Sequence, residues 1–109
     1  ALTPAHLAAA NVPDDTPIAT TEGLREFSRA ILGNEPELDI TLAERDNIEA
    51  AHQLARQPDV GAIILECTNM APYAAAISAA TGLPVFSAYN FICWFQSGLM
   101  PAPFTGEIK

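Results

Sequence analysis

Apolar residues follow two patterns along this chain, one typical of helices and one typical of buried strands. Residues 60–65 read V-G-A-I-I-L, an unbroken apolar run. A strand with one face in water alternates polar and apolar side chains, whereas a strand covered on both faces does not. The run therefore predicts a central strand of a parallel sheet, buried on both sides.

Helical spacing of apolar residues appears on both sides of this strand. Thr3 and Pro4 are typical of an N-cap and a first helical position. Apolar spacing, caps and turn residues predict helices over residues 4–10, 22–32, 41–57, 70–80 and 89–100, and shorter strands over residues 16–20 and 84–88. This order predicts a single α/β domain over residues 1–109, with a doubly wound, mainly parallel sheet. Residues 101–109 carry neither pattern and are expected to form a loose tail.

The longest predicted helix shows which of its sides should be buried. Ile48, Ala51 and Ala55 recur at helical spacing and are expected to face the core. Asp46 and Glu49 fall on the other side, so this face is predicted to be solvated.

The charge of the chain excludes several classes of partner. The formal net charge is −8 and the isoelectric point about 4.4, which disfavours nucleic acid and anionic membrane surfaces. No apolar run approaches the ~20 residues of a membrane span, and residues 1–7 do not resemble a signal peptide. The two cysteines do not suggest a disulfide framework, so a reducing, cytoplasmic setting is expected.

The most informative residues follow the central strand. Cys67 is predicted to lie where the strand ends, and Thr68 and Asn69 are good N-caps for the helix expected next. A helix start offers free N–H groups and partial positive charge, which favour a thiolate. The N–H groups of Thr68, Asn69 and Met70, with the Thr68 hydroxyl, are predicted to hold an anion beside the sulfur. The alternative is that Cys67 only fills space at the strand end.

The segments E-C-T-N-M-A-P-Y (residues 66–73) and T-G-L-P-V-F (residues 81–86) resemble the second, C-terminal half of the aspartate/glutamate/hydantoin racemase superfamily. The resemblance implies two similar α/β lobes with the active site between them. It also implies catalysis without a cofactor, with one cysteine from each lobe beside the substrate α-carbon. Cys67, Thr68 and Asn69 match the pattern, whereas Glu66 stands where many members have Gly. The chain is thus expected to be one lobe, truncated near its first strand and inactive alone.

Three functions remain open on these observations. The first is racemisation or epimerisation of an amino acid or related carboxylate, with Cys67 as one of two thiols. The second is cysteine-dependent decarboxylation or cis-trans isomerisation of a dicarboxylate in the same superfamily. The third is a non-catalytic lobe that binds a small anion or a partner.

The predicted helix from Tyr89 to Met100 is apolar almost all round. A helix without a polar face should be buried against a partner. Residues 89–100 are therefore expected to pack against a second lobe or another subunit, with Trp94 as an anchor.

The remaining candidates have ordinary structural explanations. Cys93 is expected to pack in apolar surroundings, and Asp14-Asp15 to form a turn. His6 and His52 lack neighbours at ligand spacing, so no metal site is predicted. Residues 73 and 90, a tyrosine and an asparagine, either line the cleft or serve helix packing.

Overall fold

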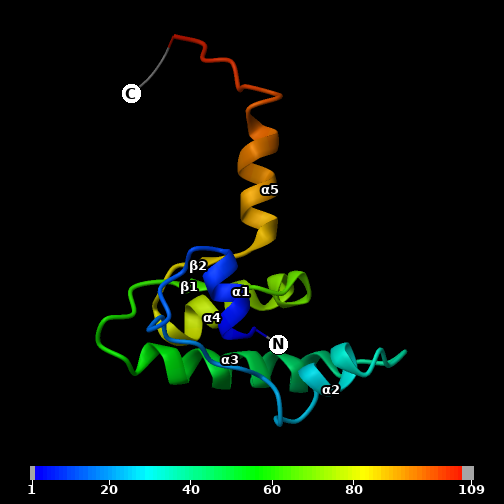
Figure 1. Cartoon of the computed structure of the whole chain (residues 1–109). Coiled ribbons are helices and arrows are strands. Elements are labelled where there is room, and N and C mark those ends of the chain that lie inside the picture. Colours follow the sequence, from blue (N-terminus) through cyan, green and yellow to red (C-terminus); the bar gives the residue numbers. More distant parts are fainter. Residues whose placement is uncertain (1, 107–109) are drawn as a thin grey trace.

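Helices form most of the regular structure, and a two-residue parallel strand pair lies among them (Figure 1). The computed structural model describes residues 2–106. In chain order the elements are α1 (Pro4–Ala9), α2 (Phe27–Leu32), α3 (Ile40–Ala55), β1 (Ile63–Ile64), the 3-10 helix η1 (Thr68–Tyr73), α4 (Ala74–Thr81), β2 (Val85–Phe86) and α5 (Ala88–Ser97).

The sheet is far smaller than predicted, so the doubly wound fold class was wrong. Strands β1 and β2 pair in parallel, with Ile63 opposite Val85 and Ile64 opposite Phe86. Hydrogen bonds from Ile63 N–H to the Pro84 carbonyl (3.0 Å) and from Leu65 N–H to the Phe86 carbonyl (2.8 Å) hold the pair. Within residues 2–106 no third strand joins them.

The apolar run was misleading because only one face of β1 is covered. Ile63 and Leu65 point into the core, with 3% and 8% of their surface exposed, whereas Ile64 between them is 77% exposed. The apolar run therefore does not indicate a strand that is buried on both faces. One of its faces is buried and the other is exposed to solvent. The strand predicted over residues 16–20 is also absent: Pro17 has no N–H to donate, and Ile18 is about half exposed.

The predicted helices are present, with shifted boundaries. The predicted cap of α1 is confirmed, since the Thr3 side chain accepts a hydrogen bond from His6 N–H. Helix α3 begins after Asp39, whose side chain accepts from Leu42 N–H at 3.0 Å. Helix α2 begins at Phe27, five residues later than predicted.

A buried carboxylate sets the late start of α2. Asp46 of α3 is fully buried, which corrects its prediction as part of a solvated face. Its Oδ2 accepts from the N–H groups of Glu26 (2.6 Å) and Phe27 (2.9 Å), and its Oδ1 accepts from Arg25 N–H (3.2 Å) and Arg25 Nη1 (2.9 Å). The first N–H groups of α2 are thus capped from another helix. Burial raises the pKa of Asp46, but the backbone hydrogen bonds from Phe27, Glu26 and Arg25 outweigh it and hold the pKa below its ordinary value.

One small core joins α2, α3, η1, α4 and the inner side of β1. The rings of Phe27 and Tyr73 meet edge to face, with centroids 6.0 Å apart and planes at 85°. Ile77 of α4 is almost completely buried beside them. The buried apolar cluster consists of Phe27, Ala43, Ala51, Ile63, Leu65, Tyr73 and Ile77.

Helix α5 stands away from this core (Figure 1). Every residue of α5 is exposed, including Tyr89 and Trp94. The molecule extends over 54 × 35 × 27 Å, because the helix points outward from the body. Residues 101–106 form neither helix nor strand, as predicted, while the rest of the predicted tail, residues 107–109, lies outside the described residues. None of the helices in residues 2–106 is long and apolar enough to cross a membrane.

We predict that Asp46→Asn lowers the free energy of unfolding at pH 7 by about 3 kcal/mol, because an amide cannot satisfy the same buried donors. The pKa of Asp46 is lower in the folded chain. Its carboxylate therefore stabilises the fold above about pH 4, and this contribution is lost as pH falls further. Urea unfolding from pH 2 to 7 should show a weaker acid dependence in the variant. The exposed Asp59→Asn is the matched control, and equal stability of the two variants at pH 7 would contradict this role.

Candidate functional site

Cys67 lies three residues after β1, at the start of η1, as the sequence predicted in outline. Its backbone is extended, with φ −97° and ψ 131°. The side chain is half-buried and packs against the edge of the apolar core, as does Met70. Thr68 and Asn69 are exposed. The four predicted site residues thus share one turn, but two face inward and two face solvent.

The helix after Cys67 differs from the predicted one in its first turns. Residues 68–73 form a 3-10 helix that contains Pro72, and the α-helix begins only at Ala74. The N–H of Met70 donates to the Cys67 carbonyl at 3.0 Å, so it is not free to hold an anion. Within the described residues, the N–H groups of Thr68 and Asn69 donate to no protein acceptor. Any anion at this turn would therefore depend on those two groups.

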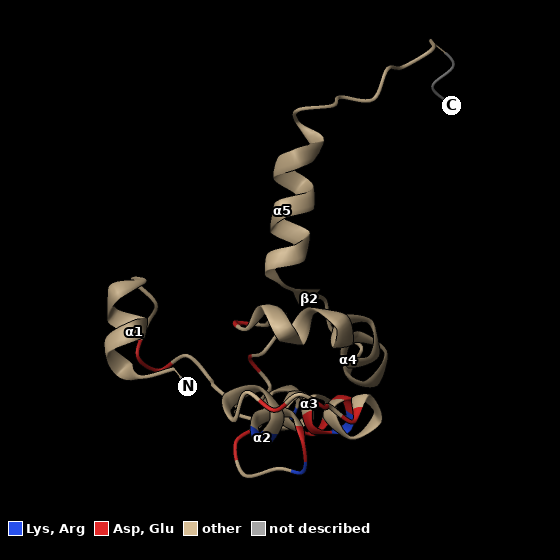
Figure 2. Ribbon diagram, turned by 90° about the vertical axis from the view of Figure 1, so that its right-hand side faces the viewer, with Lys and Arg blue, Asp and Glu red and all other residues tan. Residues whose placement is uncertain are grey.

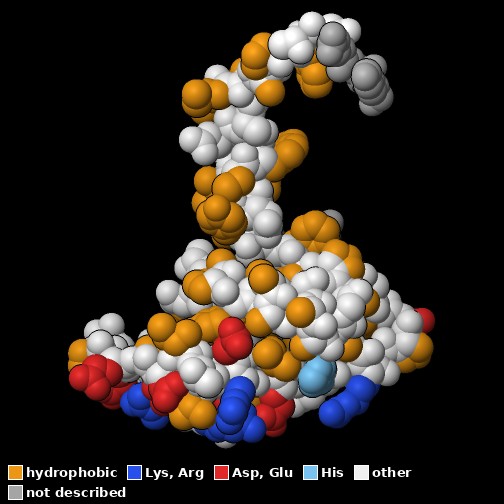
Figure 3. All heavy atoms as spheres, turned by 180° about the vertical axis from the view of Figure 1, so that it is seen from behind, with side chains coloured by type: hydrophobic (Ala, Val, Ile, Leu, Met, Phe, Trp, Pro, Cys, Tyr) orange, Lys and Arg blue, Asp and Glu red, His pale blue; other side chains and the backbone are white. Residues whose placement is uncertain are grey.

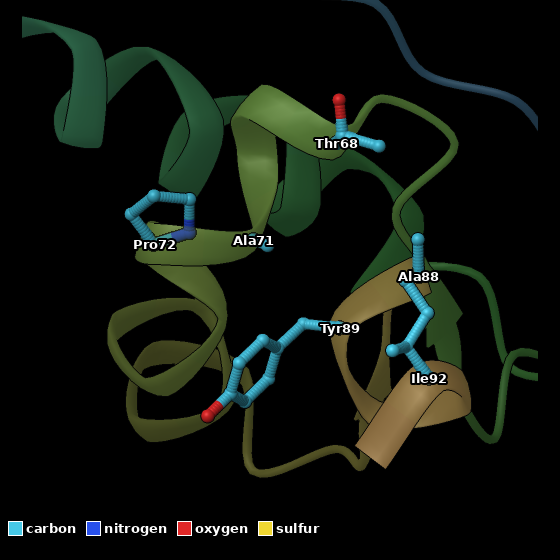
Figure 4. A pocket seen from close by; sticks show the side chains of 6 residues that line it. All are labelled: Thr68, Ala71, Pro72, Ala88, Tyr89 and Ile92. Atoms are coloured by element: carbon cyan, nitrogen blue, oxygen red, sulfur yellow. The ribbon is translucent and has the colours of Figure 1, made fainter. Parts of the chain in front are cut away.

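An apolar hollow of about 500 Å³ lies between η1 and the base of α5 (Figure 4). Thr68 borders it, which places the hollow one residue from Cys67, although Cys67 itself does not line it. The Thr68 hydroxyl points away from the ring of Tyr89 in this view. The residues that line the hollow are Thr68, Ala71, Pro72, Ala88, Tyr89 and Ile92.

Sequence reasoning missed most of this lining. Tyr89 and Ile92 are three residues apart and share one side of α5, which was the available signal. The sequence pattern of residues 89–100 predicts packing against a partner, and it does not by itself indicate a hollow. The identities of Ala71 and Pro72 did not indicate that these residues line a hollow, because alanine and proline occur in many turns that border none.

A second hollow of about 380 Å³ lies on the other side of the base of α5, lined by Phe86, Ser87, Asn90, Phe91 and Trp94. Asn90 has a structural role here. Its Oδ1 accepts from the N–H and the hydroxyl of Ser87, both at 3.1 Å, which closes the first turn of α5.

Tyr73 belongs to the core and not to a cleft. Only 4% of its surface is exposed. Burial and, to a smaller extent, the charge of Glu44 raise the pKa of the Tyr73 phenol. Tyr89 is instead exposed at the hollow.

The other candidates are spread over the molecule. Cys93 is exposed on α5, which corrects the expected packing of this thiol. His6 Nδ1 lies 3.0 Å from the Thr3 N–H at the α1 cap, and His52 Nε2 lies 3.4 Å from the Ala80 carbonyl. Asp14 and Asp15 are exposed in a turn. Among residues 2–106 no three His, Cys, Asp or Glu side chains gather as metal ligands would.

The chain is similar to part of a known enzyme. It is 36% identical over 79 residues to the dimethylsulfoniopropionate lyase of Durusdinium sp. clade D, a match that covers 72% of this chain and 26% of the lyase. The chain thus spans about a quarter of the length of this curated relative. A match of that length cannot begin after residue 31 or end before residue 79, so β1, Cys67 and η1 lie within it. No family profile matches the chain, and no solved structure matches it.

We predict that the Tyr73 phenol ionises at higher pH than an ordinary tyrosine. Because the pKa of Tyr73 is raised by folding, the buried phenol contributes stability that is complete below about pH 10 and lost as pH rises further. Absorbance titration of tyrosinate should show an upper step that Tyr73→Phe removes and that Tyr89→Phe, the matched control, retains. A single step that either variant halves equally would contradict the burial of Tyr73.

Proposed function

We propose that Cys67 acts, as a thiolate, as the base of an enzyme that removes the proton α to a carboxylate. The observation that carries the proposal is the position of Cys67. It is a half-buried thiol three residues after β1, next to Thr68, which lines an apolar hollow, and beside two unpaired N–H groups. General-base catalysis needs such a group within reach of the proton and partly shielded from water.

In this proposal the reaction is a β-elimination. The Cys67 thiolate takes the α-proton and becomes a thiol. The electron pair of the broken C–H bond forms a carbon–carbon double bond, and the group on the β-carbon leaves with its bonding pair. For a β-sulfonio carboxylate the leaving group is a neutral sulfide, so no general acid is required to protonate it. Loss of the proton from Cys67 to water restores the thiolate.

The lyase relative favours elimination over the other outcomes of the same first step. That enzyme is named for a sulfonium-bearing propionate, which combines a carboxylate with a β-leaving group. The match necessarily includes Cys67 and η1, which supports carrying the reaction class to this turn. An apolar hollow also suits the alkyl groups of such a substrate better than a second charged group.

The carboxylate would be held by hydrogen bonds and not by a cation. No charged residue occurs between Glu66 and Glu107, so residues 67–106 offer no Lys or Arg. The N–H groups of Thr68 and Asn69 are the donors that remain at the turn. The substrate class is therefore a small monocarboxylate whose other end is apolar or a diffuse cation.

Racemisation is the second candidate, and the resemblance of residues 66–73 to the racemase superfamily favours it. Racemisation needs an acid on the opposite face of the α-carbon from Cys67. Cys93, the other thiol of this chain, is exposed on α5, so we propose that any opposing group lies outside residues 2–106. Elimination needs only the one base.

We predict that Cys67→Ala lowers kcat/KM for proton removal by about 10²–10⁴-fold, the usual contribution of a general base. The protein would be incubated with β-sulfonio and α-amino carboxylates in deuterated water. NMR would then follow α-proton exchange and alkene formation, and chiral chromatography would detect racemisation. Cys93→Ala is the matched control and should retain full activity. Unchanged turnover in Cys67→Ala would refute the base assignment.

A binding test separates catalysis from a lobe that only binds. We expect a small carboxylate such as propionate to slow iodoacetamide labelling of Cys67 and to leave labelling of Cys93 unchanged, because only Cys67 adjoins the unpaired N–H groups of Thr68 and Asn69. Mass spectrometry of both peptides in the same sample supplies the control. Protection without any turnover would favour a binding lobe, and equal protection of both thiols would place the carboxylate elsewhere.

A further inference from the structure

An uncovered apolar surface runs from the outer face of the sheet along α5. The paired residues Ile64 and Phe86, both exposed, form its base, and Phe86 shares a hollow with Phe91 and Trp94 of α5. Figure 3 shows hydrophobic side chains along the helix that stands out from the body. Phe91, Trp94 and Phe95 lie on one side of α5, and each is about two-thirds exposed. The rings of Phe91 and Trp94 lie 6.1 Å apart. We call Phe91, Trp94 and Phe95 the α5 stripe.

The amount of exposed area is too large for a lone chain of this mass. A folded monomer of 11.6 kDa should expose about 5,800 Å², whereas this chain exposes 8075 Å². The radius of gyration is 16.7 Å against about 13 Å for a compact domain of this length. The excess over the whole chain, about 2,200 Å², is comparable to the area that each subunit of a large homodimer buries.

Most charges of the chain lie away from α5, although the exposed Glu66 follows Ile64 by two residues. Acidic and basic residues gather around α2, α3 and the loops near them, and α5 carries none (Figure 2). The sequence explains this, since residues 67–106 contain no Asp, Glu, Lys or Arg. A partner on α5 must therefore tolerate an uncharged surface, and a charged partner would lose hydration without gaining an ion pair.

We propose that a second copy of this chain docks on the α5 stripe and the outer face of the sheet. A second copy brings an equally uncharged apolar surface, and the acidic bodies, each of net charge −8, stay at opposite ends of the pair. The surface also has a recess, which is the hollow at the base of α5 that Phe86, Phe91 and Trp94 line. The exposed side chains of the α5 stripe on one copy could enter the recess of the other. A self-complementary patch of this kind is what a two-fold dimer requires. Docking is independent of the chemistry proposed for Cys67.

The chain carries its own reporter for this contact. Trp94 is its one tryptophan and is 69% exposed. Burial of Trp94 in a dimer should shift its fluorescence to shorter wavelength as protein concentration rises. Sedimentation equilibrium on the same samples should give twice the chain mass, about 23 kDa.

A pair of variants on α5 tests the surface. Phe95→Glu places a charge in the α5 stripe and keeps the reporter, and it should raise the dimer dissociation constant by about 30-fold or more. Gln96→Glu adds the same charge on the other side of the helix from Phe91 and Trp94 and should leave the constant unchanged. Circular dichroism checks that each variant is folded, and Phe91→Glu replaces Phe95→Glu if that variant is not.

Two results would overturn the proposal. One is a wild-type chain that remains monomeric, with no shift of Trp94 emission, up to the highest soluble concentration; in that case another molecule, or none, covers α5. The other is equal weakening by Phe95→Glu and Gln96→Glu, which would place the contact elsewhere. A dimer that Phe95→Glu alone disrupts would support it.

Discussion

The carboxylate of Asp46 fixes the position on which the core and the candidate site depend. It holds the first N–H groups of α2 from the middle of α3, and so determines where Phe27 enters the core. The Phe27 ring meets the edge of Tyr73, the last residue of η1, and η1 begins beside Cys67. A buried carboxylate on one helix therefore orients, through one aromatic contact, the turn that carries Cys67. A buried charge is costly unless every hydrogen-bond donor to it is well placed. The donors from Arg25, Glu26 and Phe27 must therefore keep their positions around Asp46.

The sheet and α5 both leave apolar surface uncovered: one side of the sheet is buried, and no side of α5 is. Ile63 and Leu65 supply the core, while Ile64 and Phe86 point the other way into solvent. Helix α5 continues from that outer face and buries none of its residues. The hollow beside Cys67 lies at the junction of the two regions, between η1 and the base of α5. Anything that covers α5 would therefore also border the candidate site.

Much of the local structure could be predicted from residue types. Thr3 and Pro4 start α1, the Gly at position 82 ends α4 in a left-handed conformation with φ 70°, and helical spacing located α3 and α5. The position of Cys67 between a strand and a helical turn was also predictable from the change of pattern at residue 66. These features depend on interactions within a few positions along the chain, which one sequence displays directly.

Features that depend on distant residues were not predictable. Asp46 has the spacing of a solvated residue, and only the approach of α2 from 20 residues away makes it a buried cap. Apolar composition at residues 60–65 determined that a strand forms, but the number of covered faces was decided by which elements pack on them, and the core covers only the side of Ile63 and Leu65. The same composition made α5 apolar, while its exposure was decided by the absence of any described element above it. The sequence by itself thus determined the caps, the helices and the turn that carries Cys67. The tertiary structure decided what each face meets, because burial is a property of neighbours that are distant along the chain.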